Sequence, residues 1–351
     1  VRPILKTSAV VLIESNRPLE IIDLEVPKLR RGQVLVEVAF SGVCYTQVLE
    51  WRGYRGVDPY LPHCLGHEGS GSVLEIGDGV TKVERDDHVI LSWIKGSGIN
   101  AGGSVYSWGK QCVNAGPITT FNRTSVISED RLTVIPSNFS LKMAALVGCA
   151  LPTGLGSVFN VAQPISGQSI AIFGVGGVGL CTAMAAKVNG CTPIIAIDLV
   201  EQKLELAKAI GVTHLINASQ DSVLERIIQI CPDGVDFAIE ATGRPNVMCQ
   251  AIESVRPRGG SVVIVGNARH GEIWELDPKQ LNLGKRIFGT WGGDSQPDRD
   301  YLRYCNLAMT GSLNLGAFLT PPTYALHGIN SALTDLELGK LTRPIIDLSI
   351  L

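Results

Sequence analysis

Between residues 168 and 291, short apolar runs alternate with stretches of helical character. Helices are predicted from the glycine-rich segment that begins at Gly174 to Asn189, over Glu201–Ile210, over 222–230 and near 247–255. The six apolar runs are SIAIFGV (169–175), PIIAIDL (193–199), HLINAS (214–219), VDFAIEA (235–241), SVVIVGN (261–267) and KRIFGTW (285–291). Parallel strands need long crossovers and are buried on both faces. The alternation therefore predicts an α/β fold with a doubly wound, parallel, six-stranded sheet.

A G-x-G-x-x-G pattern at Gly174, Gly176 and Gly179 follows the first predicted strand and opens a predicted helix. In this context the pattern predicts a dinucleotide site, with a tight turn, a close backbone approach to a pyrophosphate and close helix packing. Asp198 ends the next strand, where a carboxylate binds ribose hydroxyls and repels a 2′-phosphate, which favours NAD. The alternative is a purely structural glycine turn. The further candidate cofactor contacts are Gly177, Val178, Lys203 and Gly266.

Outside residues 168–291 the apolar runs do not alternate with helical stretches. Residues 1–150 are expected to be β-rich, with apolar runs at 34–40, 71–76 and 88–92 between glycine, proline and aspartate turns. Residues 302–351 hold two predicted helices and a last strand at 344–350, too little for a separate core, so they are expected to pack on the first domain. We therefore predict one domain from 1–150 and 291–351 and another from 151–290.

Charge and cysteine content limit the classes of partner. With 30 Lys and Arg against 33 Asp and Glu, the chain has no basic surplus, so neither nucleic acid nor a membrane is an expected partner. The nine scattered cysteines indicate a reducing compartment, and the N-terminal residues lack a signal-peptide pattern. A cytoplasmic location is expected.

Three segments of the first domain carry metal-ligating side chains: GVCYT (42–46), GHE (66–68) and GCALPTG (148–154). Two thiolates and one imidazole suit Zn²⁺, and three protein ligands leave the open fourth position of a catalytic site. Taken singly, each segment has another interpretation as a buried cysteine or a core histidine.

Together these segments resemble those of the zinc-dependent medium-chain dehydrogenase/reductase family, the alcohol dehydrogenases. The matching motifs are GVCYT, GHEGSG (66–71), GCALPTG, GVGGVG (174–179) with Asp198, and LTRPIIDL (341–348). The resemblance implies a GroES-like catalytic domain with an inserted Rossmann domain. It also implies an enzyme that transfers hydride between NAD and an alcohol or aldehyde, with zinc and nicotinamide between the two domains.

The resemblance also assigns roles to individual residues. It makes Cys44, His67 and Cys149 the catalytic zinc ligands, Thr46 the acceptor of the alcohol proton and Glu68 a transient metal ligand. Arg343 matches a residue that contacts the cofactor phosphates, and Thr153 one beside the nicotinamide. The alternatives are a plain acid without a metal role for Glu68, a surface arginine for Arg343 and a helix cap for Thr153.

Two departures from the family pattern have consequences. Gln47 replaces a carboxylate that usually supports the zinc site, and Leu49, in place of a histidine, cannot relay a proton. Many relatives hold a second, structural zinc with four close cysteines, but the corresponding segment 93–112 has only Cys112. One catalytic zinc and no structural zinc are therefore expected. This segment is expected to be a glycine-rich loop held by Tyr106 and Trp108.

The sequence constrains the identity of the substrate less than any other feature. Thr46, Leu49 and Trp93 are the candidate pocket residues, with Tyr45, Trp51, Trp108 and Trp291 as further aromatic candidates. They favour a hydrophobic or aromatic primary alcohol, and the alternative substrates are a polyol, a threonine-like amino alcohol and a larger activated sugar. The alternative functions are a metal-free quinone or enoyl reductase of the same superfamily and a non-enzymatic NAD-binding sensor. A homodimer or homotetramer is expected, with residues 261–276 supplying an exposed sheet edge.

Overall fold

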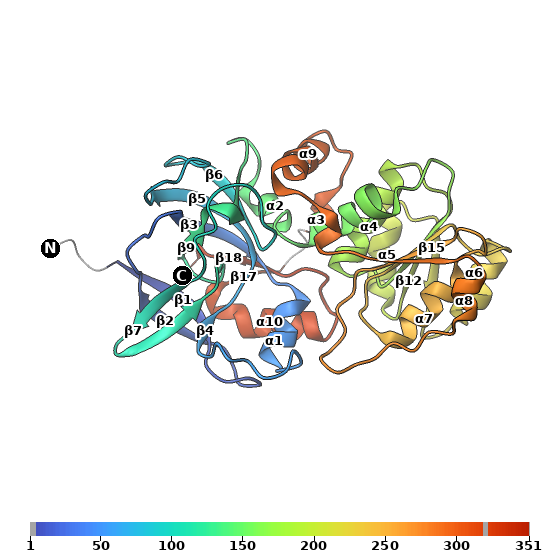
Figure 1. Cartoon of the computed structure of the whole chain (residues 1–351), viewed down its shortest axis with the longest axis horizontal. Coiled ribbons are helices and arrows are strands. Elements are labelled where there is room, and N and C mark those ends of the chain that lie inside the picture. Colours follow the sequence, from blue (N-terminus) through green and yellow to red (C-terminus); the bar gives the residue numbers. More distant parts are fainter. Residues whose placement is uncertain (1–4, 319–321, 351) are drawn as a thin grey trace. The chain divides into compact units, whose positions relative to one another are not determined.

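The computed structural model describes residues 5–318 and 322–350, which form two compact units. The first comprises the residues up to Cys149, Gln296–Met309 and the residues from Phe318 on, and the second comprises Ala150–Ser295 and Thr310–Ala317 (Figure 1). Each unit has its own sheets and its own core.

A closed five-stranded barrel forms one part of the first unit. Its strands, in spatial order, are β1 (Lys6–Leu12), β2 (Glu20–Glu25), β7 (Ser104–Trp108), β8 (Gln111–Ala115) and β4 (His63–Cys64). Alternate residues of β1 and β2 point into the barrel, where Leu24 and Tyr106 are fully buried. The Tyr106 hydroxyl accepts a hydrogen bond from the Val126 backbone N–H (2.8 Å).

The second sheet of the first unit is built around one long strand, β3 (Gln33–Gly42). The sheet order is β10 (Leu132–Val134), β6 (His88–Ser92), β5 (Glu68–Ile76), β3, β18 (Ile345–Asp347) and β17 (Thr323–Ala325), and β9 (Thr124–Ser128) also pairs with β3. The helices of this unit are α1 (Tyr45–Trp51), α2 (Leu141–Leu146), α9 (Pro297–Met309) and α10 (Ile329–Glu337). Ile329 and Leu333 of α10 share a core with Val36 and Val38 of β3, so this helix belongs to the first unit.

The second unit is a six-stranded sheet in which every pairing is parallel. Its order is β13 (His214–Asn217), β12 (Ile194–Asp198), β11 (Ile170–Phe173), β14 (Phe237–Glu240), β15 (Ser261–Ile264) and β16 (Arg286–Gly289). The connecting helices are α4 (Gly177–Val188), α5 (Glu201–Ile210), α6 (Val223–Ile230) and α7 (Pro245–Ser254), with α3 (Ala150–Gly156) before the sheet and α8 (Lys279–Asn282) before β16. The six predicted strands and the doubly wound fold are confirmed.

β11 and β12 are apolar at every position except the last residue of β12. Because side chains alternate between the two faces of a sheet, both faces are apolar and must be covered. Ala171 and Phe173 pack in one core with Val223 of α6 and Ala251 of α7. Ile172 faces the other way, toward α4. Helices on both faces are what a parallel sheet requires.

Two predictions about these elements were wrong, and one strand was missed. The segment 93–112 contains β7 and part of β8, which pair as a hairpin, and Trp108 is partly exposed rather than holding a loop. β17 was not foreseen, because three residues carry too weak a pattern. β15 pairs on both sides, so β16, and not residues 261–276, forms that edge of the sheet.

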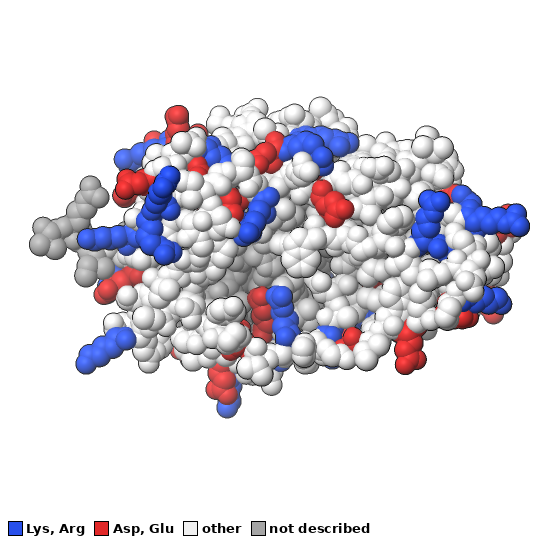
Figure 2. Space-filling view, in the orientation of Figure 1, with Lys and Arg blue, Asp and Glu red and all other residues white. Residues whose placement is uncertain are grey.

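Charged side chains of both signs share the visible surface (Figure 2). On the face drawn in Figure 2, basic and acidic side chains are interspersed, with no continuous area of one sign. Among the described residues, no helix has both the length and the apolarity needed to span a bilayer.

Candidate active site

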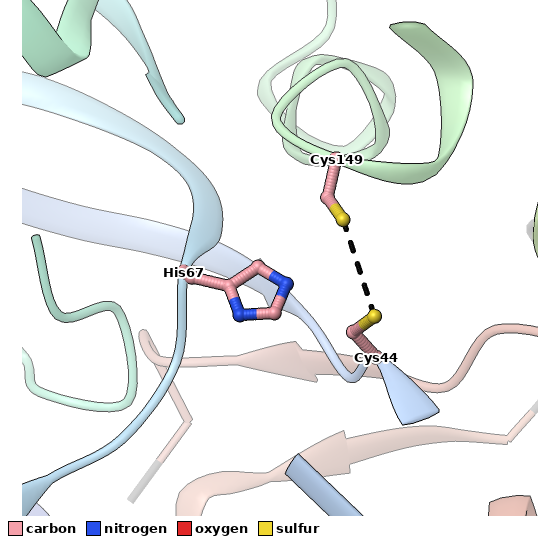
Figure 3. A group of neighbouring side chains, drawn as sticks. All are labelled: Cys44, His67 and Cys149. Atoms are coloured by element: carbon pink, nitrogen blue, oxygen red, sulfur yellow. Dashed lines mark hydrogen bonds between the residues drawn. The ribbon is translucent and has the colours of Figure 1, made fainter. Parts of the chain in front are cut away.

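Cys44, His67 and Cys149 meet at one point of the first unit (Figure 3). Cys44 directly precedes α1, His67 directly precedes β5, and Cys149 directly precedes α3. Their ligand atoms all lie within 4.8 Å of one another. Within residues 5–318 and 322–350 this is the one grouping of three such side chains with metal-site geometry.

The donor set fits a tetrahedral zinc ion. The two sulfur atoms lie 3.9 Å apart, close to the roughly 3.8 Å edge of a tetrahedron with zinc–sulfur bonds of about 2.3 Å. His67 Nε2 is buried and makes no hydrogen bond within the described part of the chain. A buried nitrogen in this state calls for a ligand, and three protein donors leave a fourth position open.

The two thiols and the imidazole perturb one another's protonation. The Cys149 thiol donates a hydrogen bond to the Cys44 sulfur, which lowers the pKa of Cys44, and the Arg343 charge lowers it further against the effect of burial. The same contact, together with burial, raises the pKa of Cys149. Burial would lower the pKa of His67, but the nearby Cys44 sulfur raises it above its ordinary value. The pair therefore gives up one proton more readily than two separate buried thiols would, because the remaining thiol and Arg343 stabilise the thiolate.

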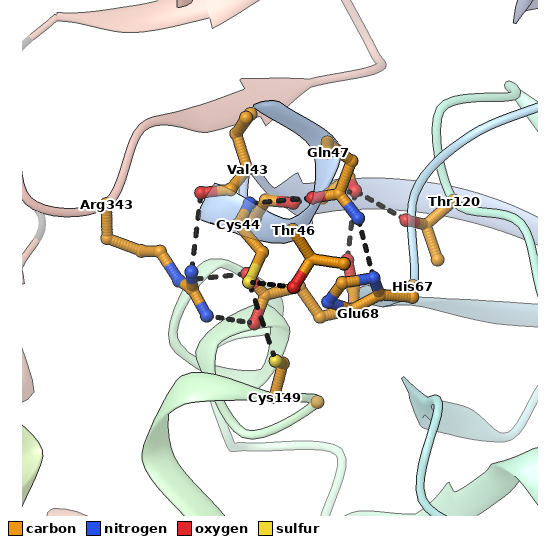
Figure 4. Close-up of polar contacts among 12 residues, drawn as sticks. Val43, Cys44, Thr46, Gln47, His67, Glu68, Thr120, Cys149 and Arg343 are labelled. Atoms are coloured by element: carbon orange, nitrogen blue, oxygen red, sulfur yellow. Dashed lines mark hydrogen bonds and ion pairs between the residues drawn. The ribbon is translucent and has the colours of Figure 1, made fainter. Parts of the chain in front are cut away.

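Glu68 and Arg343 form a buried ion pair beside the ligands (Figure 4). Arg343 Nε lies 2.9 Å from Glu68 Oε1, and Nη2 donates to Oε2 at 3.1 Å. Both side chains are almost fully buried, so neither is a surface residue. Burial would lower the pKa of Arg343, but the Glu68 charge raises it. Transient metal ligation by Glu68 would require its carboxylate to leave Arg343, and phosphate binding by Arg343 stays a prediction.

Two side chains of α1 also face the ligands. Gln47 is buried, its Oε1 accepts a hydrogen bond from the Cys44 N–H (2.8 Å), and its Nε2 lies 2.6 Å from His67 Nδ1. The Thr46 hydroxyl lies 3.6 Å from the Cys44 sulfur, at the edge of the cluster. The Gln47 amide therefore lies beside His67, where many family members are expected to have a carboxylate.

Close packing explains two glycines of the sequence motifs. A Cβ at Gly42 would collide with the Glu68 carboxylate, and one at Gly148 would lie 2.8 Å from Glu68 Cβ. A Cβ at Gly148 would come closer still to the Leu91 carbonyl oxygen. Gly42 thus makes room for the Glu68 carboxylate, and Gly148 makes room for the backbone of Leu91 and for Glu68.

Two residues that support this site, Ser92 and Tyr301, were not predicted from the sequence. Ser92 Oγ donates to the Gly148 carbonyl (2.7 Å), and the Tyr301 hydroxyl lies 2.6 Å from Ser92 Oγ. Since the single Ser92 proton serves the carbonyl, Tyr301 donates to Ser92. Ser92 and Tyr301 are far apart in the sequence, and neither belongs to a motif, so only the fold brings them to Cys149.

In the second unit, the glycine-rich loop has the predicted strand–turn–helix form. Gly174 has a φ of +86° and forms the turn after β11. A Cβ at Gly179 would overlap the Gly174 carbonyl oxygen, whereas a Cβ at Gly176 would meet nothing within 4 Å. Gly177 and Val178 begin α4, whose N-terminal N–H groups are suited to binding an anion.

The other predicted cofactor residues lie at the ends of neighbouring strands. The Asp198 carboxylate accepts hydrogen bonds from Val175 N–H (2.9 Å) and Val200 N–H (3.0 Å), which fixes it beside the loop and leaves further lone pairs. Lys203 lies in the first turn of α5, and Gly266 follows β15.

Of the remaining predicted residues, some are placed differently from the expectation. Thr153 lies inside α3, so the interpretation as a helix cap is wrong. Leu49 is buried in α1, and Trp93 directly follows β6 and is partly exposed. Trp51 belongs to the core, with its indole N–H donating to the Arg17 carbonyl (2.7 Å), so it is not a pocket wall. Cys112, on β8, is exposed.

Two family models match the chain. A model described as "Alcohol dehydrogenase GroES-like domain" matches residues 30–137, and one described as "Zinc-binding dehydrogenase" matches residues 177–306. The first range includes Cys44 and His67, and the second begins inside the glycine-rich loop, at Gly177.

Known proteins match over nearly the whole chain. An S-(hydroxymethyl)glutathione dehydrogenase of Synechocystis sp. is 32% identical, with 97% of this chain and 100% of the relative covered. An alcohol dehydrogenase class-P of Arabidopsis thaliana is 30% identical, with 98% and 97% covered. The crystal structure of a benzyl alcohol dehydrogenase from Acinetobacter calcoaceticus superposes with a TM-score of 0.88 at 28% identity, covering 98% of this chain and 99% of that one.

Proposed function

Because the chain belongs to the zinc-dependent alcohol dehydrogenase family of medium-chain dehydrogenases/reductases, an oxidoreductase family, we propose that it transfers hydride between NAD and a hydrophobic or aromatic primary alcohol. The observation that carries the proposal is the convergence of Cys44, His67 and Cys149, with ligand atoms within 4.8 Å. A bound zinc ion supplies a Lewis acid for the alcohol oxygen, and NAD supplies the hydride acceptor.

The residues of the first unit hold the metal and manage the proton. Cys44, His67 and Cys149 would hold the zinc with three ligands and leave one coordination position open. The Thr46 hydroxyl, 3.6 Å from the Cys44 sulfur, would receive the alcohol proton and release its own in the same relay. Leu49 cannot pass this proton on, so the proton leaves through another group or water. Glu68 and Arg343, buried against each other, keep a net neutral environment behind the two thiolates.

The residues of the second unit bind the dinucleotide. The open space at Gly176 and the N-terminus of α4 receive the pyrophosphate. The fixed Asp198 carboxylate accepts hydrogen bonds from the adenosine ribose and repels a 2′-phosphate, which gives the preference for NAD over NADP. Lys203, Gly266 and Thr153 are further cofactor contacts of this unit. From the first unit, we propose that Arg343 binds the cofactor phosphates while it remains paired with Glu68.

Zinc per chain, measured by elemental analysis, tests the metal site. The wild type should hold about one zinc, Cys149→Ser should lose it, and Cys112→Ser, at an exposed cysteine, should keep it. This result would also support the absence of a structural zinc. No zinc in the wild type would instead favour a metal-free reductase or a sensor, and two would mean that residues 93–112 bind metal.

The proposed substrate class rests on Leu49 and Trp93 and on the likeness to a benzyl alcohol dehydrogenase. NAD reduction should have a higher kcat/KM with benzyl alcohol than with ethanol, and Trp93→Ala should lower that ratio. A reaction that is faster with S-(hydroxymethyl)glutathione would assign the chain the substrate named for its Synechocystis relative instead.

A homo-oligomer is also part of the proposal. The exposed edge of the six-stranded sheet is β16, which pairs only with β15 among the described strands and carries the partly exposed Phe288. Edge strands of this kind pair readily with a second copy. Light scattering coupled to size exclusion should give a mass of two or four chains, and Phe288→Lys should lower it.

A further inference from the structure

The Gln47 side chain joins the candidate metal ligand His67 to the start of α1, and this inference rests on the proposed zinc site. Its amide makes one hydrogen-bond contact at each end, with the Cys44 N–H (2.8 Å) and with His67 Nδ1 (2.6 Å) (Figure 4). Gln47 is only 1% exposed, so water does not compete for these partners.

The first contact fixes the orientation of the amide. A backbone N–H can only donate, so the atom that faces Cys44 N–H is the Gln47 oxygen. The amide NH₂ group then faces His67 Nδ1 and donates to it. Nδ1 must therefore carry a lone pair, and the proton of the neutral imidazole lies on Nε2, the nitrogen that is not bonded to Gln47.

This arrangement opposes metal binding. Zinc at this site needs the Nε2 lone pair, and a metal-bound histidine normally donates its other N–H to a neighbouring oxygen. In the zinc-bound state the Nε2 proton is lost and Nδ1 gains one, so the proton count of the neutral ring is unchanged. Gln47 must then turn its oxygen toward Nδ1, which leaves its NH₂ group facing the Cys44 N–H, donor against donor.

We propose that Gln47 is a positioning residue that weakens zinc retention, because its amide cannot serve His67 and Cys44 together in the zinc-bound state. A carboxylate at the same position could accept from both groups at once. Zinc binding is therefore coupled to a rotation of the Gln47 amide and to the loss of a hydrogen bond at the N-terminus of α1.

The tautomer of His67 gives a test that does not depend on a variant. In ¹⁵N-histidine-labelled wild type, at a pH where the imidazole is neutral, two-bond ¹H–¹⁵N spectra should place the His67 proton on Nε2 in the chelator-treated protein and on Nδ1 after zinc is restored. A His67→Gln variant identifies the resonances. A proton on Nδ1 in the zinc-free protein would overturn the proposal.

Zinc release gives the second test. After transfer to excess chelating dye, Gln47→Glu should release zinc about 10–100-fold more slowly than the wild type, the usual size of such supporting contacts. The matched control is Gln33→Glu, because buried Gln33 also accepts a backbone N–H, from Arg30 (2.9 Å), without a histidine partner; its release rate should be that of the wild type.

The possible failures can be told apart. Equal or faster release from Gln47→Glu contradicts this inference alone, provided that the wild type holds one zinc. A wild type that binds no zinc under any loading condition contradicts the proposed function itself.

Discussion

Glu68 and Arg343 form a buried ion pair in which each charge is stabilised by the other. Both side chains are nearly inaccessible to water, and Arg343 also lies within hydrogen-bonding distance of the Val43 carbonyl (3.4 Å). Removing one partner leaves a buried charge unpaired, which is costlier than removing both.

Glu68→Gln should therefore lower the free energy of unfolding of the first unit by about 3–5 kcal/mol. Glu68→Gln combined with Arg343→Met should cost less than the sum of the two single changes. Urea unfolding of the four proteins of this cycle measures the coupling. Additive effects would show that the pair contributes no interaction energy.

Ser92 carries the second prediction about individual residues. Ser92→Ala removes the hydrogen bond to the Gly148 carbonyl and a partner of the Tyr301 hydroxyl, which should cost about 1–3 kcal/mol and speed zinc release. Tyr301→Phe leaves the Ser92–Gly148 bond in place, so it should have a smaller effect on zinc. Unfolding curves and dye-detected zinc release report the two quantities, and an unchanged release rate in Ser92→Ala would contradict the supporting role.

At the scale of the elements, the turn from β11 into α4 contains one glycine that leaves space for the cofactor, Gly176, and one that close packing requires, Gly179. Gly176→Ala should leave the stability close to that of the wild type, because its Cβ meets nothing, but should weaken NAD binding. Gly179→Ala should weaken both, since its Cβ would overlap the Gly174 carbonyl oxygen. Circular dichroism melting and NAD fluorescence titration distinguish them. Unimpaired NAD binding by Gly176→Ala would place the pyrophosphate elsewhere.

The starts of β11 and β14 are tied together by Asp236. Its carboxylate accepts hydrogen bonds from the Ser169 N–H (2.9 Å) and hydroxyl (2.8 Å) and from Arg256 (2.8 Å). Burial would raise the pKa of Asp236, but these donors lower it below the ordinary value. The stabilisation is thus complete above the unfolded pKa of about 3.9 and is lost as the pH falls toward the folded pKa.

Asp236→Asn should cost about 1–3 kcal/mol at pH 7 and should lose less stability than the wild type on acidification below pH 4. Urea unfolding at several pH values measures both effects. Asp233→Asn, in the exposed turn before β14, is the control and should change the stability by less than about 0.5 kcal/mol.

At the scale of the whole molecule, the two units have separate cores and separate candidate binding sites. The candidate zinc ligands belong to the first unit, and the glycine-rich loop and Asp198 belong to the second. A ligand that binds only the folded state stabilises the unit that holds it.

Chelation should therefore lower hydrogen-exchange protection in β3 and β5 and leave β11 and β14 unchanged. NAD at about 100 times its Kd should raise the stability of the second unit by about 2.7 kcal/mol. Hydrogen exchange read by mass spectrometry resolves the two sets of strands. Equal responses in both units to zinc removal would contradict the separation.

The sequence by itself determined what depends on local pattern. The six strands of the second unit, their order of α/β alternation, the Gly174–Gly179 turn and the segments that carry Cys44, His67 and Cys149 could all be read in advance, because strand and helix periodicity and the glycine requirements act over a few residues.

Only the tertiary structure decided what depends on contacts between distant residues. The pairing of Arg343 with Glu68, the support of Gly148 by Ser92 and Tyr301, the two bonds of the Gln47 amide and the position of β16 at the sheet edge all join segments with no shared local signal. Their partners are set by the way the chain buries its apolar surface and satisfies its buried polar groups, which no short stretch of sequence specifies.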